Sequence, residues 1–297
     1  MMNERNLKGI FVPVVTPFQT NNELDLDSYQ KYLRSLLTHE IQGLVVNGTT
    51  GEAPTVCWDE VTSLVELTKH TMKNNPIPLI VGTGTNDTMS TLKRTELAAE
   101  LGADAVLIVV PYYNRPSQEG IVEHFRAVAQ VGIPVIMYEV PSRTGVRITL
   151  DTARTILDMD GVIGLKDCSG NTELVSELTR LSSKPVLCGE DIYFHSMLTA
   201  GASGGILASA SIETAKFLQV FRLAEEGRDL EAMTVFESMV PFIRLLFKES
   251  NPSPLKWLLA RQGLIASDHV RLPMSVISSS LQEEMEQMLV SNLSGIM

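Results

Sequence analysis

The stretch Ala105-Val-Leu-Ile-Val-Val-Pro111 is the longest apolar run in the chain, and a second such run, Pro134-Val-Ile-Met-Tyr-Glu139, follows it after an amphipathic segment. Both runs have the length of a strand. An uninterrupted apolar run is typical of a strand that is buried on both faces of a parallel sheet. Six similar runs occur elsewhere, at residues 9–16, 43–47, 78–82, 162–166, 185–189 and 204–207.

Amphipathic segments separate these runs and are predicted to be helices. Three of them follow residues that favour a helix N-terminus: 29–37 after Asp27 and Ser28, 61–72 after Asp59, and 121–128 after Ser117. A regular alternation of strands and helices indicates an α/β fold with a parallel sheet.

Eight strand–helix units favour a closed (β/α)8 TIM barrel over a doubly wound sheet, which usually stops at five or six strands. After residue 207 the pattern predicts only helices, at residues 212–226, 230–247, 254–262 and 281–289. The first of these would be the eighth barrel helix. We therefore expect a barrel domain over residues 1–226 and a C-terminal helical region over 227–297 that packs on the barrel.

Composition excludes several classes of protein. The chain has 297 residues, and its 24 Lys and Arg against 35 Asp and Glu give a net charge of −11, which disfavours nucleic-acid and acidic-membrane partners. Three cysteines are too few for a disulfide framework or a zinc site. The N-terminus is polar, and no apolar run approaches the roughly 18 residues of a membrane span. These features predict a cytoplasmic protein.

Lys166 ends an otherwise apolar strand, at the face of the barrel where active sites form. We expect its amine to lie near a desolvated interior, which favours the neutral form that attacks a carbonyl to give a Schiff base. Tyr138 ends the preceding strand and would supply a phenol beside that amine. The residues alone leave a simpler alternative open, in which Lys166 pairs with Asp167 and extends into solvent while Tyr138 only packs the barrel.

Other motifs narrow the chemistry. Gly48-Thr-Thr-Gly-Glu52 could hold a carboxylate or a phosphate on backbone N–H groups, or could be a simple turn. No Gly-Lys-Ser/Thr follows it, and Gly82-Thr-Gly84 lacks the remainder of a dinucleotide fingerprint, so we expect no nucleotide cofactor. The five histidines are isolated and have no metal-ligand spacing. We therefore expect neither a cofactor nor a metal, and the lysine itself would activate the carbonyl.

The chain resembles the dihydrodipicolinate synthase/N-acetylneuraminate lyase family along essentially its whole length. The strings that carry the resemblance are Gly48-Thr-Thr-Gly-Glu52, Pro111-Tyr-Tyr-Asn-Arg-Pro-Ser-Gln-Glu-Gly120, Tyr138-Glu-Val-Pro-Ser-Arg-Thr-Gly145, Gly164-Leu-Lys-Asp-Cys-Ser-Gly170, Glu249-Ser-Asn-Pro-Ser-Pro-Leu-Lys-Trp257 and Arg271-Leu-Pro273. The resemblance makes Lys166 the Schiff-base residue.

The resemblance also implies roles for further residues. Those expected to act in catalysis or at a tight dimer interface are Lys166, Tyr138 as general acid/base, Thr49 and Tyr113 as its proton relay, and Tyr112 at the interface. Those expected to bind substrate are Thr50, Arg143, the backbone of Ile206, and Gly189. The implied assembly is a homotetramer built from two tight dimers, in which Tyr113 needs a partner subunit.

The activity that the resemblance implies is condensation of pyruvate with L-aspartate 4-semialdehyde to 4-hydroxy-tetrahydrodipicolinate, in lysine (diaminopimelate) biosynthesis. Arg143 favours this acceptor, because a planar guanidinium suits a carboxylate. The alternatives are other pyruvate aldolases of the same mechanism: N-acetylneuraminate lyase, 2-keto-3-deoxy sugar acid aldolase or 4-hydroxy-2-oxoglutarate aldolase. A ligand-sensing barrel without turnover is a third class, against which the intact set of Lys166, Tyr138, Thr49 and Tyr113 argues.

Two positions depart from the family pattern. Family members usually have Asn after the catalytic tyrosine, and this chain has Glu139. Strand alternation points Glu139 away from the side that Tyr138 faces, so we expect its effect to be structural. Lysine-inhibited members carry a His and a Glu in an allosteric pocket, and the matching residues here are Trp58 and Ser90. We therefore predict weak or no inhibition by lysine.

Overall fold

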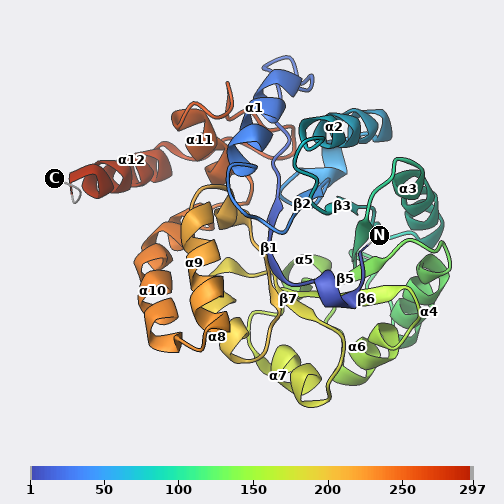
Figure 1. Ribbon diagram of the computed structural model, residues 1–297. Coiled ribbons are helices and arrows are strands. Elements are labelled where there is room, and N and C mark those ends of the chain that lie inside the picture. Colours follow the sequence, from blue (N-terminus) through green and yellow to red (C-terminus); the bar gives the residue numbers. More distant parts are fainter. Residues whose placement is uncertain (1, 295–297) are drawn as a thin grey trace.

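The structure is a computed structural model and describes residues 2–294. Its centre is a closed barrel of parallel strands in sequential order (Figure 1). Strand β1 pairs with β8 as well as with β2, which closes the barrel. The strands are β1 (Gly9–Pro13), β2 (Gly43–Val46), β3 (Leu79–Gly82), β4 (Ala105–Val109), β5 (Val135–Glu139), β6 (Val162–Asp167), β7 (Val186–Cys188) and β8 (Gly204–Ile206). The predicted TIM barrel is confirmed, and closure leaves no unpaired sheet edge.

Helices follow the strands around the outside of the barrel (Figure 1). The α-helices are α1 (Leu26–Leu36), α2 (Trp58–Thr71), α3 (Thr88–Glu100), α4 (Gln118–Ala129), α5 (Pro141–Thr144), α6 (Leu150–Leu157), α7 (Glu173–Arg180), α8 (Phe194–Thr199), α9 (Thr214–Glu225), α10 (Asp229–Leu246), α11 (Ser253–Arg261) and α12 (Ser279–Ser294). Short 3-10 helices are η1 (Glu4–Asn6), η2 (Ala53–Thr55), η3 (Asp191–Tyr193) and η4 (Ala208–Ser211).

All three helices begin about a turn earlier than predicted, and two of the three predicted caps were wrong. Helix α1 begins at Leu26, because the side chain of Asp25 accepts a hydrogen bond from the backbone N–H of Ser28. Helix α2 begins at Trp58, where the carboxylate of Glu60 bonds back to the N–H of Cys57. The predicted cap of α4 is confirmed: the Ser117 hydroxyl accepts from the N–H of Gly120.

Strand alternation divides the apolar residues into two layers. On β1, Phe11 belongs to the cluster inside the barrel, whereas Ile10 and Val12 belong to the larger cluster between the strands and the helices. The interior cluster also contains Tyr138. Because the interior is filled with side chains, substrates can enter only at the ends of the strands.

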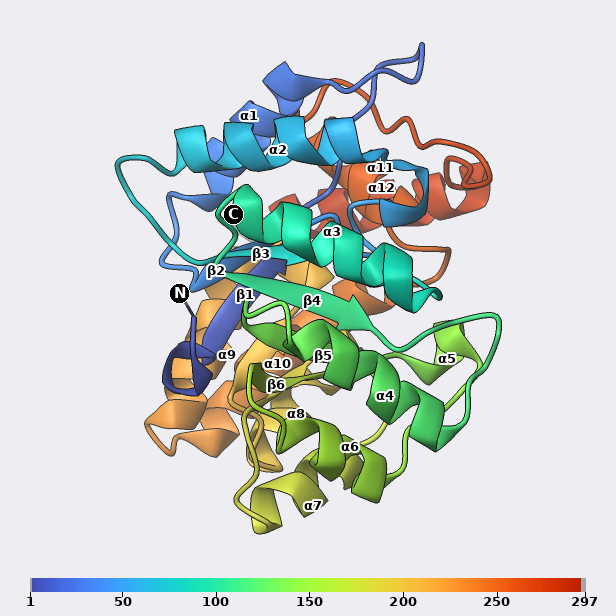
Figure 2. The ribbon, with the colours of Figure 1, turned by 90° about the vertical axis from the view of Figure 1, so that its right-hand side faces the viewer.

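The C-terminal helices lie against one side of the barrel. Helix α10 packs along α9, and α11 is buried over most of its length close to α1 (Figures 1 and 2). Among the described residues, no helix combines the length and the apolar character needed to cross a bilayer. The domain boundary near residue 226 and the cytoplasmic location both stay predictions.

Candidate active site

Tyr138 and Lys166 lie side by side at the C-terminal ends of β5 and β6, where they are register partners. The Lys166 side chain is 7% exposed, and its Nζ lies 4.3 Å from the centroid of the Tyr138 ring. This contact between the ammonium and the aromatic face stabilises the lysine side chain in the barrel mouth. Of the two arrangements that the residues alone left open, the structure therefore has the one in which the amine stays inside beside the phenol.

Gly189, directly after β7, makes room for the lysine. A Cβ atom at this position would lie 2.6 Å from Cε of Lys166 and 2.4 Å from Sγ of Cys168. Any larger residue would therefore displace the Lys166 side chain. Gly189 was predicted to bind substrate; in the described structure, its lack of a side chain leaves room for Lys166.

A cavity opens above Lys166 and contains most of the predicted site residues; we call it the lysine cavity. Its predicted members are Lys166, Tyr138, Thr49, Thr50, Arg143, Gly189 and Ile206. Thr49 and Thr50 come from the turn after β2, and Ile206 is the last residue of β8. Strands from opposite sides of the barrel therefore supply one site.

The hydroxyl of Thr49 and the thiol of Cys168 lie beside the phenol of Tyr138, with the Cys168 sulfur 3.9 Å from the phenol oxygen. Burial raises the pKa of Tyr138 well above its ordinary value, the nearby Cys168 raises it further, and the polar side chain of Thr49 opposes this shift. Tyr138 therefore rests as a neutral phenol, which can donate a proton and recover it through Thr49.

Two acids, Glu190 and Asp191, also line the lysine cavity. Glu190 and Asp191 follow β7, and burial raises the pKa of both carboxyls, while the charge of Lys166 opposes the shift. The Asp191 carboxylate is fixed by the backbone N–H of Ser209 at 2.6 Å. These acids give the positively charged Lys166 side chain counter-charges in the same cavity.

Arg143 stands at the entrance. It belongs to the short helix α5 (Pro141–Thr144), which is capped by Gly145 at a φ of 73°. The side chain is exposed and lines both the lysine cavity and a second, adjoining cavity. An arginine in this place can bind a carboxylate that approaches from solvent.

The two adjacent tyrosines differ in position. Tyr112 lines the adjoining cavity together with Thr49 and Tyr138. Tyr113 is 88% exposed, has a φ of 72°, and borders neither cavity. Within one chain the predicted relay is therefore limited to Tyr138 and Thr49, and Tyr113 lies apart from them.

Glu139 points away from the site, in agreement with strand alternation. It is fully buried outside the barrel, and its Oε1 accepts a hydrogen bond from the N–H of Ile148 at 3.1 Å. Its Oε2 has no hydrogen-bond partner among the described residues, and burial raises the pKa of Glu139 to about 7. The neighbouring Asp167 also faces outward, so neither carboxylate contacts the lysine cavity.

Several lining residues were missed as site residues by the sequence analysis. Phe247 at the end of α10 and Asn251 in the segment after it also line the lysine cavity. The side-chain amide of Asn251 donates a hydrogen bond to the Thr50 hydroxyl at 3.0 Å. No periodicity connects positions this far apart in sequence, although Asn251 lies in one of the quoted strings. Cys168 and Glu190 could have been found, because both follow the C-terminal ends of predicted strands.

Among residues 2–294, no three His, Cys, Asp or Glu side chains are grouped closely enough to bind a metal ion. The expected metal independence stays a prediction.

The comparison with protein families identifies the chain. The model of the dihydrodipicolinate synthetase family matches residues 6–292. The chain belongs to this family. A 4-hydroxy-tetrahydrodipicolinate synthase of Clostridium acetobutylicum is 36% identical, covering 95% of this chain and 99% of its own length. A dihydrodipicolinate synthase structure from Thermotoga maritima superposes with a TM-score of 0.92 at 34% identity, covering 98% of this chain and 99% of its own. A structure described as the first monomeric dihydrodipicolinate synthase variant gives 0.92 at 34% identity, with coverages of 96% and 97%.

Proposed function

We propose that this protein condenses pyruvate with L-aspartate 4-semialdehyde to 4-hydroxy-tetrahydrodipicolinate. The observation that carries the proposal is the buried Lys166 amine against the Tyr138 ring, in a cavity that also contains Thr49 and Thr50. The family and the names of the relatives support this reaction. The roles of the individual cavity residues in this reaction belong to the same proposal.

The first half of the reaction forms the nucleophile. The Lys166 amine attacks the C2 carbonyl of pyruvate, the carbinolamine loses water with a proton from Tyr138, and an iminium remains. Loss of a proton from C3 then gives an enamine. Thr49 passes protons to and from Tyr138, so a neutral phenol of high pKa can act alternately as acid and base. The Thr50 hydroxyl and the backbone of Ile206 would hold the pyruvate carboxylate.

The second half joins the two substrates. The enamine carbon attacks the aldehyde carbon of the semialdehyde, and the new alkoxide takes a proton from Tyr138. The amino group of the bound semialdehyde then displaces Lys166 from C2, closing the ring and freeing the enzyme. Arg143 at the cavity entrance would bind the semialdehyde carboxylate and orient the aldehyde.

Borohydride trapping tests the proposal. With pyruvate present, reduction should leave a stable mass increase on Lys166, and Lys166→Ala should abolish it. Consumption of pyruvate should then require aspartate semialdehyde rather than N-acetylmannosamine or a sugar-derived aldehyde. Absence of an adduct would exclude every Schiff-base reaction. Turnover with a sugar aldehyde alone would show that the acceptor is this aldehyde and not aspartate semialdehyde.

We also propose that Tyr113 acts in the site of a second copy, within a tight dimer of a homotetramer. Its side chain is almost fully exposed and lies outside both cavities of its own chain. A phenol that completes a partner's relay has reason to be exposed in the single chain. Tyr112 would then lie at the same interface, next to the adjoining cavity.

Mixing two inactive variants tests this assembly. Lys166→Ala and Tyr113→Phe should each have little activity, and their mixed dimers should regain one working site because each chain supplies what the other lacks. Light scattering measures the mass of the assembly directly. A monomer with full activity would contradict the proposal.

A further inference from the structure

The turn that carries Thr49 and Thr50 ends in a strained residue. Glu52 has a φ of 57°, in the left-handed region, and its side chain is only 3% exposed. Such a conformation costs a non-glycine residue about 1 kcal/mol or more, and persists where the surroundings hold it. The contacts that hold Glu52 therefore also decide where the two threonines lie.

Those contacts come from the C-terminal helices. Lys256 of α11 is fully buried, and its Nζ donates to Oε1 of Glu52 at 2.8 Å. The same Nζ donates to the backbone oxygen of Thr16 at 2.9 Å, and the Thr16 hydroxyl donates to the oxygen of Gly51 at 2.7 Å. Lys256 thus fixes the turn in two ways. It binds the Glu52 side chain directly, and it binds Thr16, whose hydroxyl donates to the backbone of Gly51.

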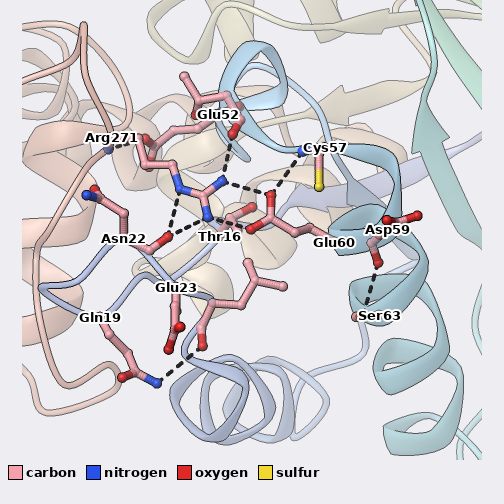
Figure 3. A network of polar contacts seen from close by, with 12 residues as sticks. Thr16, Gln19, Asn22, Glu23, Glu52, Cys57, Asp59, Glu60, Ser63 and Arg271 are labelled. Carbon is pink, nitrogen blue, oxygen red and sulfur yellow. Dashed lines mark hydrogen bonds and ion pairs between the residues drawn. The ribbon is translucent and has the colours of Figure 1, made fainter.

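Arg271 closes the other side of Glu52. Its backbone N–H donates to Oε2 of Glu52 at 3.1 Å, and its guanidinium binds Glu60 of α2 and the backbone of Asn22 and Thr55 (Figure 3). Both oxygens of the Glu52 carboxylate are therefore occupied by residues from the C-terminal part of the chain.

Stability alone does not explain a buried ion pair here. Removing two charges from water is costly, and a buried pair can often be replaced by apolar residues without loss of stability. The ion pair does, however, fix the direction and the position of the Glu52 side chain, and Glu52 lies three positions after Thr49. Asn251 adds a third link from the same region, to the Thr50 hydroxyl.

We propose that Glu52 and Lys256 are positioning residues, through which the C-terminal helices hold Thr49 and Thr50 in the catalytic site. The proposal rests on the proposed function. It gives a role to the string around Lys256 and to Arg271, which the barrel chemistry leaves unassigned.

The decisive variant is the double substitution Glu52→Gln/Lys256→Met. Each single substitution leaves a buried charge without its partner and should lower stability. The double variant has no such charge, so its melting temperature should recover. Its kcat should nevertheless fall by about 10- to 100-fold, as expected when reacting groups move by about 1 Å. The rate of borohydride trapping should fall with it.

A second variant keeps both charges. Glu52→Asp shortens the side chain by one methylene, so the ion pair can persist only if the turn moves. Its kcat should fall about tenfold, although its melting temperature stays near that of the wild type. This variant decides the question if the double variant does not fold. Arg261→Met serves as the control, because it breaks an exposed ion pair on the same helix and should leave kcat and KM unchanged.

The outcomes separate the two proposals. If the wild type traps pyruvate and the folded variants keep kcat within twofold, the pair is only structural and the positioning proposal is wrong. If the wild type itself traps no pyruvate, the proposed function fails first. Loss of kcat in the variants at a preserved melting temperature supports positioning.

Discussion

Consecutive residues of one strand have opposite environments in this protein. Tyr138 faces the barrel interior beside Lys166, whereas Glu139 is buried on the outside with one carboxylate oxygen unpartnered. Burial raises the pKa of Glu139 to about 7. In the unfolded chain the same carboxyl loses its proton near the ordinary glutamate value, so the unfolded state binds fewer protons between about pH 4.5 and 7. Glu139 therefore makes the folded state less stable as the pH rises through this interval.

Replacing Glu139 by Gln should remove this pH dependence. The amide keeps an acceptor for the Ile148 N–H and has no charge to bury. We expect thermal unfolding to show a gain of about 1–3 kcal/mol at pH 8.5 and little change at pH 5. Glu173→Gln is the control, because Glu173 is an exposed acid that lines the same pocket outside the barrel as Glu139. Equal shifts for Glu139→Gln at both pH values would show that the carboxyl does not titrate in this range.

Gly189→Ala should displace the Lys166 side chain while leaving its amine chemically unchanged. The added Cβ would approach both Lys166 and Cys168 closer than van der Waals contact. We expect a destabilisation of about 1–3 kcal/mol and slower trapping of pyruvate, because Lys166 must leave its rotamer. Gly120→Ala in α4, where a Cβ meets only ordinary contacts, is the matched control. Unchanged trapping by Gly189→Ala would mean that the lysine has free space elsewhere.

Short elements carry residues of the proposed substrate site. The four-residue helix α5 brings Arg143 to the cavity entrance. Arg143→Ala should raise KM for aspartate semialdehyde at least about tenfold, by loss of a charge-assisted bidentate contact. Pyruvate trapping on Lys166 should be unaffected, which borohydride and mass spectrometry can check. A matched loss of pyruvate trapping would assign Arg143 to the keto acid instead.

The sequence was most informative about the strands. All eight apolar runs became barrel strands, because burial on both faces leaves a continuous pattern in the residues. Helix starts were harder to predict, because Asp25 and Asp27 are equally good capping residues in the sequence and Cys57 is a poor one. Asn251 and Lys256 were not assigned to the site or its support, because contacts over such separations follow from tertiary packing. The register of Tyr138 beside Lys166, by contrast, followed from the order of the strands.

The positions that match the family's lysine pocket include Trp58, which lies next to Arg94 of the adjoining cavity. Arg94 lines this cavity, and its guanidinium lies 5.8 Å from the centroid of the Trp58 ring. A lysine ammonium entering here would meet a like charge, and Ser90 offers no carboxylate in compensation. We predict weak or no inhibition by lysine in an activity titration. Half-inhibition below 1 mM, which corresponds to a binding free energy of about 4 kcal/mol or more, would contradict this, and Trp58→His/Ser90→Glu should increase the sensitivity.

The link between Glu52 and Lys256 joins an early turn to a late helix. During synthesis on the ribosome, all eight strands leave the exit tunnel before Lys256 does. A nascent barrel therefore contains a carboxylate whose counter-ion has not yet been made. The last helices complete the site, so catalytic competence is acquired only when translation is nearly finished.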